Sequence, residues 1–400
     1  MAGNGQIGSA DVVIVDGART PFGNFGGALR GVSAIDLATV ASKEALKRSG
    51  VAADKIDQVI FGNVIQSSAD AIYGARHVGL KSGCRVDAPA LTVNRLCGSG
   101  LQAIVNGAEQ IMLGRATYVL AGGMENMSQA PHVIRGARWG LGLGQGKLED
   151  SLWEGLTDSY NGMPMAITAE NLAKQYEITR EEADRFSLRS QRNAARSVED
   201  GFFAEEIAPV EVGGKKGPQL VVRDEGPRPG VTIEQLAKLA PRFKRDGVVT
   251  PGNASGITDG AAAVVLTTAS QAEKDGLKPL GRIVTWAFCG VDPDVMGIGP
   301  AYAIPIALER AGMKLDDLDV VEINEAFAPQ VLACADALHV DMERLNPNGG
   351  AIALGHPLGA SGARIAYSIL HELRRRNKRL GVASACIGGG QGIAGIVEAF

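Results

Sequence analysis

The sequence predicts an α/β fold made of two homologous halves, with an inserted loop domain between them. Aliphatic runs such as residues 11–16 alternate with amphipathic stretches such as residues 33–48, which is the pattern of strands packed against helices. A second observation is internal: the segment 45–50 recurs as segment 307–312, at an offset of 262 residues. A third is that the residues between the two copies resemble neither of them.

The same offset holds at separate places along the chain. It aligns Ser99 with Ser361, and a strand ending at Ala121 with one through Ala383. A constant offset across separate matches indicates duplication of one α/β unit. We therefore predict a first half at residues 1–126 whose closing elements extend to 277, an inserted domain at 127–277, and a second half at 278–400.

The elements of the first half follow from hydrophobic periodicity and from glycine. Residues 11–16 read as a buried strand, and residues 33–48 as an amphipathic helix that ends at Gly50. Residues 57–61 and 118–121 read as two further strands. Strands that alternate with helices in this way form a layered sheet covered by helices.

The insertion differs from both halves in composition. It contains a glycine-rich stretch at 139–146, a helical stretch at 168–196 and a polar, proline-containing segment at 213–230. Basic residues gather here, although the whole chain is acidic: Lys215, Lys216, Arg223, Arg228, Arg242, Lys244 and Arg245. They indicate either a solvated loop surface or contacts to a phosphate-bearing ligand.

Composition limits the class of protein. The 400 residues are 45% hydrophobic and 21% charged with a net charge of −4, which predicts a globular protein that binds neither nucleic acid nor membrane. Residues 1–10 show no signal peptide, so a cytoplasmic location is expected. Five widely spaced cysteines and five histidines, without C-x-x-C or H-E-x-x-H, predict no disulfide framework and no metal.

Cys97 is the first candidate for chemistry. It lies in Leu96-Cys97-Gly98-Ser99-Gly100, just before a stretch with helical periodicity. Amides at a helix start favour thiolate, so we expect a lowered thiol pKa and a nucleophile that small neighbours leave accessible. The alternative is a buried cysteine that serves only as a small hydrophobe.

Three stretches of the second half supply partners for a nucleophile. His356 lies in a glycine-rich turn before a helix, where a packing role is not evident. Cys386 ends a strand and is followed by Gly388, Gly389 and Gly390, whose backbone amides are free to stabilise an oxyanion. Asn324 ends another strand and could bind a carbonyl oxygen or a water.

The offset aligns Cys97 with Gly359 and Met124 with Cys386, so the two cysteines occupy different loops of the repeated unit. Ligands of α/β sheets bind outside the carboxyl ends of strands, where both cysteines lie.

Six motifs, in this order along essentially the whole chain, resemble those of the thiolases, the acetyl-CoA C-acyltransferases. They are Leu96-Cys97-Gly98-Ser99-Gly100, Gly123-Met124-Glu125-Asn126-Met127-Ser128, Asn253-Ala254-Ser255-Gly256, Asn324-Glu325-Ala326-Phe327, Gly355-His356-Pro357 and Cys386-Ile387-Gly388-Gly389-Gly390. The resemblance implies a thiolase-like fold with α-β-α-β-α layers. It also implies an acyltransferase of fatty acid metabolism or β-oxidation that condenses two acetyl-CoA or cleaves 3-ketoacyl-CoA.

The resemblance also implies the roles of the site residues. The match to Cys97 carries the acyl group as a thioester, the match to His356 activates that thiol, and the match to Cys386 moves the proton at C2 of acetyl-CoA. Asn324 with a water, together with His356, resembles the oxyanion hole for the enolate. The backbone amides of Cys97 and Gly388 resemble the hole for the tetrahedral intermediate.

By the same likeness, the insertion holds CoA as a substrate, and no cofactor is permanently bound. Ser255 matches a residue that contacts pantetheine, and Arg228 one near the adenine and phosphates. Five matches line the pocket: Leu156, Met165, Phe243, Ala326 and Phe327. Pro164 stands where short-chain biosynthetic thiolases carry histidine, so this segment looks more like that of mitochondrial-type 3-ketoacyl-CoA thiolases.

Two other functions stay open at this point. A ketoacyl synthase pairs its cysteine with two histidines, which would require His339 or His371 beside His356. A catalytically silent acyl-CoA-binding paralogue is the other, although both cysteines and the histidine are present. Thiolases are commonly oligomeric, so a homodimer or homotetramer is expected.

Overall fold

The computed structural model describes residues 8–214 and 217–400. The first seven residues of the predicted N-terminal segment, and Lys215 and Lys216 of the basic segment, lie outside the described residues. The first half contains β1 (Val12–Arg19), β2 (Gly23–Asn24), α1 (Ala34–Ser49), η1 (Ala53–Lys55), β3 (Gln58–Gly62), η2 (Ala71–Tyr73), α2 (Gly74–Lys81), β4 (Ala90–Val93), α3 (Ser99–Met112) and β5 (Val119–Asn126).

The inserted segment is built from short elements around two longer helices. They are η3 (Met127–Gln129), β6 (His132–Ile134), η4 (Ala137–Trp139), β7 (Leu148–Asp150), α4 (Ser151–Gly155), β8 (Thr157–Asp158), β9 (Met163–Pro164), α5 (Met165–Gln175), α6 (Arg180–Glu199), α7 (Phe202–Glu206), β10 (Val210–Val212), β11 (Gln219–Val221) and α8 (Ile233–Ala237). β12 (Thr258–Thr268) and α9 (Ala269–Lys274) follow. β12 pairs with both β1 and β5, so it closes the sheet of the first half.

The second half repeats the order of the first. It contains β13 (Gly281–Gly290), η5 (Pro293–Ile298), α10 (Gly299–Ala311), η6 (Leu315–Asp317), β14 (Val320–Ile323), α11 (Ala328–Leu338), α12 (Ala351–Leu354), α13 (Leu358–Arg375), β15 (Leu380–Ile387) and β16 (Gln391–Ala399).

The predicted repeat is visible in the elements. The offset of 262 places η1 on η6, α3 within α13 and β5 one residue from β15. Helices α1 and α10 both end at a glycine in the left-handed conformation, Gly50 (φ 69°) and Gly312 (φ 66°). Ser33 caps the start of α1 by accepting from the amide of Asp36 at 3.1 Å, which agrees with the predicted helix.

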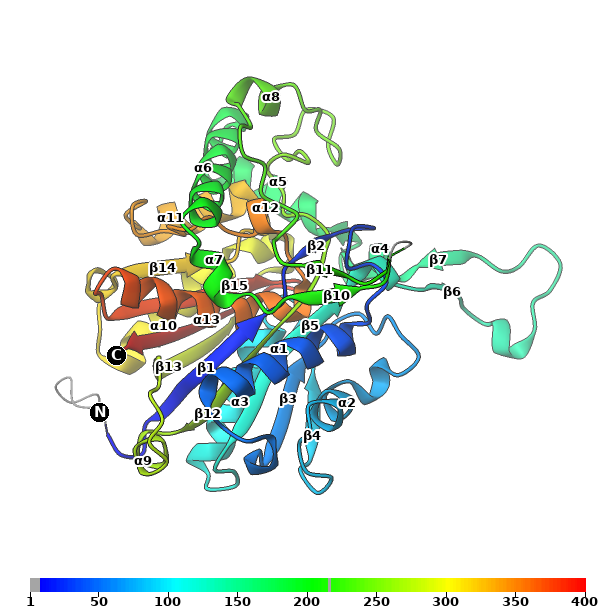
Figure 1. The fold of residues 1–400 in the computed structure, drawn as a ribbon. Coiled ribbons are helices and arrows are strands. Elements are labelled where there is room, and N and C mark those ends of the chain that lie inside the picture. Colours follow the sequence, from blue (N-terminus) through cyan, green and yellow to red (C-terminus); the bar gives the residue numbers. More distant parts are fainter. Residues whose placement is uncertain (1–7, 215–216) are drawn as a thin grey trace.

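The architecture is the expected α-β-α-β-α arrangement. Within the described residues, the strands of the main sheet follow the path β14-β15-β16-β13-β1-β12-β5-β3-β4, and β2 pairs with β12 beside it. The pairs β6-β7, β8-β9 and β10-β11 are separate two-stranded sheets. The halves join where Val13 and Ile14 of β1 pair with β13. α3 and α13 pack against each other and against strands of both halves, while α1 and α2 cover one outer face and α10 the other (Figure 1). Both central helices bury apolar residues in one shared core.

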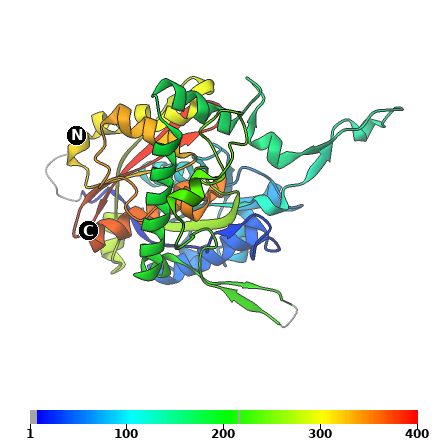
Figure 2. The ribbon, with the colours of Figure 1, turned by 90° about the horizontal axis from the view of Figure 1, so that it is seen from above.

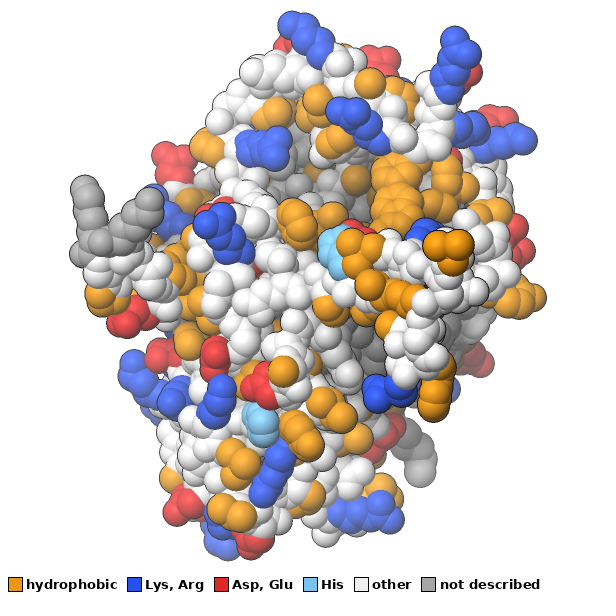
Figure 3. Space-filling view, turned by 90° about the vertical axis from the view of Figure 1, so that its right-hand side faces the viewer, with side chains coloured by type: hydrophobic (Ala, Val, Ile, Leu, Met, Phe, Trp, Pro, Cys, Tyr) orange, Lys and Arg blue, Asp and Glu red, His pale blue; other side chains and the backbone are white. Residues whose placement is uncertain are grey.

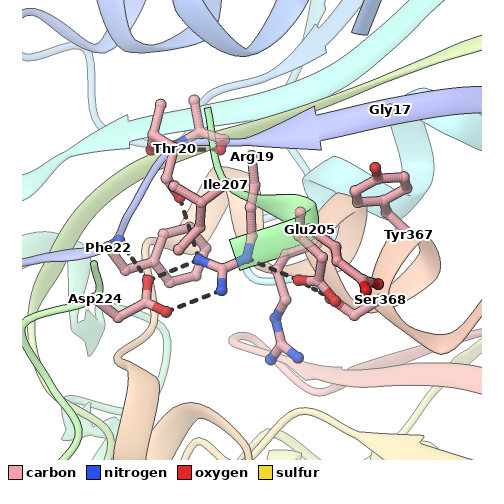
Figure 4. Close-up of polar contacts among 12 residues, drawn as sticks. Gly17, Arg19, Thr20, Phe22, Glu205, Ile207, Asp224, Tyr367 and Ser368 are labelled. Carbon is pink, nitrogen blue, oxygen red and sulfur yellow. Dashed lines mark hydrogen bonds and ion pairs between the residues drawn. The ribbon is translucent and has the colours of Figure 1, made fainter. Parts of the chain in front are cut away.

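The insertion is anchored to the first half by a buried ion cluster. Arg19 at the end of β1 donates to both carboxylate oxygens of Asp224, at 2.7 and 2.9 Å, and to Glu206 of α7 at 2.9 Å (Figure 4). Ser368 of α13 donates to the same Glu206 at 2.8 Å. Buried charges are tolerated when they are paired in this way, so these contacts fix where the insertion sits.

A hairpin arm leaves the body of the molecule. β6 and β7 pair and extend outward from the other layers in both ribbon views (Figures 1 and 2). Apolar side chains are exposed on it, among them Trp139, Leu143 and Leu148, and Figure 3 looks onto the side of the molecule from which the arm projects. No helix in residues 8–214 and 217–400 is long and apolar enough to cross a membrane.

Candidate active site

Cys97 lies in the turn that connects β4 to α3, two residues before the helix begins, as predicted. A Cβ on Gly98 would come within 2.7 Å of the side chain of Ile387, and a Cβ on Gly388 within 3.2 Å of Leu96. Small residues therefore let the turn that carries Cys97 approach the end of β15, which carries Cys386. The loops of the two halves meet at this point.

The electrostatics of Cys97 differ from the sequence prediction. Burial raises the pKa of the Cys97 thiol to about 11, although the backbone amide of Gly388 donates a hydrogen bond to it. The expectation of a lowered pKa was wrong, because loss of hydration outweighs the stabilisation from nearby amides. The resting side chain is a neutral thiol that needs a base.

His356 lies between α12 and α13, directly before the Pro357 N-cap of α13. Its Nε2 is 3.3 Å from Nδ2 of Asn324, and its Nδ1 is 2.6 Å from Oγ of Ser361. Burial, and secondarily the charge of Arg364, lowers the pKa of His356 to about 3. The ring is therefore neutral near pH 7 and has a nitrogen lone pair available to accept a proton.

Asn324 directly follows β14, where its backbone amide donates to the carbonyl of Ser384 on β15 at 2.9 Å. Its side chain is buried, and Oδ1 has no hydrogen-bond partner among the described residues. A buried acceptor without a partner is costly, so its retention indicates a ligand or a water as its partner.

Cys386 is fully buried near the end of β15. It packs with Met296 and Ala326, and Met165 and Phe327 flank this cluster. Burial raises the pKa of the Cys386 thiol well above its usual value, and the neighbouring Cys97 and Cys334 raise it further. Each of the two thiols is therefore neutral at rest, and a charge on Cys97 would disfavour ionisation of Cys386.

A carboxylate that the sequence analysis did not select supports the site. Glu125 of β5 accepts from the backbone amides of Val64, Ile65 and Gly359, at 3.0 to 3.1 Å, and from Asn63 at 3.0 Å. Gly359 is in the first turn of α13, so this side chain links the half that carries Cys97 to the turn that carries His356. Its place within the Gly-Met-Glu-Asn motif was the available signal.

An apolar cavity of about 510 Å³ opens beside His356. Cys97, Cys386 and Asn324 are not among its lining residues. The two thiols lie behind its wall: Cys97 clusters with Leu152 and Leu358, and Met165 and Phe327 pack against the cluster of Cys386. The predicted residues that line it are Leu156, Met165, Phe243, Ser255, Phe327 and His356. Ala326 is not among its lining residues and packs behind it on Cys386. Trp153, which the sequence analysis missed, lines the cavity and stacks on Phe243 with ring centroids 6.4 Å apart.

Arg228 lies elsewhere. It lines a second cavity of about 410 Å³, which shares Pro251, Ala254 and Gly256 with the first. The two cavities are therefore adjacent: one is apolar and next to His356, and the other is bordered by an exposed arginine of the insertion. This order suits a ligand with an apolar reactive end and an anionic distal end.

The other histidines do not join the site. His371 packs edge-on against Tyr367 with ring centroids 4.7 Å apart, and His339 follows the end of α11. Neither lines the cavity of His356, which is the only histidine among its described lining residues. A condensing enzyme that uses two histidines is therefore not favoured. Within residues 8–214 and 217–400, no group of three His, Cys, Asp or Glu side chains could hold a metal ion.

Known proteins with this fold and sequence identify the family. Residues 12–270 match "Thiolase, N-terminal domain" and residues 277–399 match "Thiolase, C-terminal domain". The chain is 54% identical to the mitochondrial 3-ketoacyl-CoA thiolase of Homo sapiens over 97% of this chain and 98% of the human one. It is 50% identical to an acetyl-CoA acetyltransferase of Pseudomonas aeruginosa, covering 96% and 98% of the two chains. The crystal structure of the human mitochondrial enzyme in complex with CoA superposes with a TM-score of 0.95 at 52% identity, over 99% of this chain and all of that one. The chain therefore belongs to the thiolase family of acyltransferases.

Proposed function

We propose that this thiolase transfers an acyl group between CoA and acetyl-CoA through a thioester on Cys97. The observation that carries the proposal is that a neutral imidazole lines one apolar cavity, and that two buried neutral thiols, one from each half, pack behind the side chains that line it. Net reaction in one direction joins two acetyl-CoA into acetoacetyl-CoA and CoA. The reverse direction cleaves a 3-ketoacyl-CoA.

In the first half-reaction, the sulfur of Cys97 attacks the acyl-CoA carbonyl while its proton passes to Nε2 of His356. The amides of Cys97 and Gly388 stabilise the tetrahedral oxyanion. The bond between the acyl carbon and the CoA sulfur then breaks, and Cys386 supplies the proton that CoA takes away. The products are the Cys97 thioester, free CoA, an imidazolium and a Cys386 thiolate.

In the second half-reaction, the Cys386 thiolate removes a proton from C2 of acetyl-CoA. The imidazolium of His356, and Asn324 through a water, stabilise the enolate oxygen. The enolate carbon attacks the Cys97 thioester, the new carbon–carbon bond forms, and Cys97 leaves as a thiolate. Cys97 recovers its proton from His356, so all three side chains return to their neutral resting state.

Substrate binding falls to the insertion in this proposal. Ser255 and the apolar residues of the 510 Å³ cavity would hold the pantetheine and acyl group, and Arg228 in the adjacent cavity would lie near the adenine and phosphates. The crystal structure of the human relative in complex with CoA supports CoA as the ligand. No permanently bound cofactor is required by the chemistry of the three side chains.

We also propose an oligomer, a homodimer or homotetramer, in a reducing compartment such as the cytoplasm. Leu91 is exposed on β4 at the edge of the sheet, and the arm exposes Trp139 and Leu143. All five cysteines are free, which fits a reducing environment, although the name of the human relative includes "mitochondrial". Light scattering and cell fractionation would test these two statements.

The direct test of the proposed function is transfer of a radiolabelled acetyl group from acetyl-CoA to the protein. Cys97→Ala should abolish labelling and lower turnover by on the order of 10⁴-fold or more, because no nucleophile remains. Cys289→Ala is the matched control, since Cys289 lies on β13, its thiol donates to the backbone carbonyls of Gly299 and Gly392, and it packs against a core cluster that contains neither Cys97 nor Cys386. A Cys97→Ala protein that still carries the label would disprove the assignment.

A further inference from the structure

Each half has a serine in the first turn of its central helix, at equivalent positions of the repeat. Ser99 donates to the carbonyl of Leu96 at 2.6 Å and accepts from the amide of Arg95 at 2.8 Å. Ser361 lies 3.1 Å from the carbonyl oxygen of Pro357 and 2.6 Å from Nδ1 of His356. The equivalent hydroxyls therefore have different partners: that of Ser99 contacts only backbone groups in these hydrogen bonds, whereas that of Ser361 also contacts the imidazole of His356.

The direction of these hydrogen bonds follows from what each group can do. The carbonyl of Pro357 can only accept, so the Ser361 hydroxyl donates to it and presents a lone pair to His356. Nδ1 of His356 is then the protonated nitrogen, and Nε2 accepts from Nδ2 of Asn324 at 3.3 Å. In this arrangement, the contacts of Ser361 with Pro357, of Ser361 with His356 and of His356 with Asn324 are all hydrogen bonds.

The opposite arrangement makes fewer contacts. If Ser361 donated to Nδ1, the Pro357 contact would be lost, and the protonated Nε2 would face the amide nitrogen of Asn324, which is itself a donor. His356 and Ser361 are only 5% and 1% exposed, so bulk water is not at hand to replace a lost partner.

We propose that Ser361 is a positioning residue that holds His356 in the tautomer with its proton on Nδ1. The consequence for catalysis rests on the proposed function: only this tautomer leaves Nε2 unprotonated and so able to take the proton of Cys97. Ser361 touches neither thiol in the hydrogen-bond pattern and acts through the imidazole alone. The Ser361 hydroxyl orients the ring of the base, whereas the Ser99 hydroxyl holds the backbone turn that carries the nucleophile.

The first experiment reads the tautomer directly, in the resting protein. ¹⁵N NMR of full-length protein labelled only in its histidine rings, with the His356 signals assigned by their loss in His356→Asn, should show a protonated Nδ1 and an unprotonated Nε2 near pH 7. A protonated Nε2 in the unmodified protein would overturn the inference. This readout does not depend on acyl transfer, so it is separate from failure of the Cys97 labelling test.

The second experiment removes the hydroxyl. Ser361→Ala should mix the two tautomers and lower kcat by roughly 10- to 100-fold with little change in KM, since loss of one buried hydrogen bond is expected to cost that much. Ser361→Thr, which keeps the hydroxyl, should restore the tautomer signature and most of kcat. An unchanged tautomer and kcat in Ser361→Ala would contradict the proposal.

Ser368→Ala separates positioning from general destabilisation. Ser368 is also a buried serine of α13, but it donates to Glu206 and does not contact His356. This variant should lose stability without changing the His356 tautomer or kcat. If it shifts the tautomer as Ser361→Ala does, the effect belongs to the helix and the inference fails.

Discussion

The two halves share a scaffold and differ in the chemistry that they place on it. At the turn before the central helix, the first half presents Cys97, whereas the equivalent position of the second half is Gly359 and the imidazole comes from His356. Near the ends of the equivalent strands, Met124 of β5 corresponds to Cys386 of β15. Duplication thus provided two similar loops, and the site needs a different residue from each.

Burial shifts the pKa values of the two central groups, Cys97 of the first half and His356 of the second, in opposite directions. It raises the pKa of the Cys97 thiol to about 11 and lowers the pKa of His356 to about 3, because each group loses hydration of its charged form. Nucleophile and base therefore rest in their neutral forms over the physiological range. In the proposed mechanism, the first half supplies the nucleophile, and the second supplies the groups that move protons.

Replacement of Cys386 should show the largest difference between the two half-reactions, acylation of Cys97 and condensation. Cys386→Ala should lower acetoacetyl-CoA formation by roughly 10²- to 10⁴-fold, since C2 of acetyl-CoA loses its base. Labelling of Cys97 by radiolabelled acetyl-CoA should persist, because CoA can leave as a thiolate whereas the C2 proton cannot leave unaided. Single-turnover kinetics with labelled acetyl-CoA would measure both steps.

The control for this variant is Cys334→Ala, which removes a buried thiol of α11 that lies near Cys386 but donates to Gly297. It should retain both half-reactions. If Cys386→Ala loses labelling and condensation equally, the division of labour between the halves is wrong.

The opposite pKa shifts predict opposite effects of pH on stability. The folded pKa of His356 lies below its unfolded value, so its contribution to stability is complete above about pH 6.5 and is lost as the pH falls toward 3. The folded pKa of Cys97 lies above its unfolded value, so its contribution is complete below about pH 9 and is lost as the pH rises toward 11. Within each window the slope is on the order of 1.4 kcal/mol per pH unit.

Urea unfolding across pH would measure this, with variants that cannot titrate. His356→Asn should flatten the acid side alone, and Cys97→Ala the alkaline side alone. Equal flattening on both sides, or on neither, would show that these two groups are not buried in neutral form.

The insertion should differ from both halves, because in the proposed mechanism it contacts the substrate and moves no proton. Phe243→Ala removes the ring that stacks on Trp153 in the cavity and should raise KM roughly 5- to 10-fold with kcat nearly unchanged. Arg228→Ala should raise KM only about 2- to 5-fold, since an exposed charge contributes little. Steady-state kinetics would test both.

Two comparisons sharpen this prediction. Arg185→Ala, on the same insertion but paired with Glu181 on the surface of α6, should leave KM unchanged. A large fall in kcat for Phe243→Ala would show that this ring contributes to the chemical step, and would contradict the prediction that the insertion affects only KM.

The parts of the molecule that follow a repeat or a motif were predictable from the sequence. The offset of 262 residues located equivalent helices and strands, and turns rich in small residues marked the positions of Cys97, His356 and Cys386. Roles that depend on long-range packing were not predicted, among them those of Glu125, Trp153 and Ser361. The partners of these residues are distant in the sequence or follow a turn whose path a linear pattern does not define.

The error in the Cys97 pKa has the same origin. The start of a helix can be identified from the sequence, and it favours thiolate. The degree of burial depends on β15 and on the insertion closing over the turn, and this larger effect decides the result.

The position of β12 has a consequence for biosynthesis. This strand separates β1 from β5 in the sheet, yet the ribosome makes it more than a hundred residues after β5. We expect the facing edges of β1 and β5 to stay unpaired during synthesis until residue 268 has left the exit tunnel. Chaperones bind chains with such unpaired edges. The insertion between β5 and β12 thereby delays the point at which the first half can become compact.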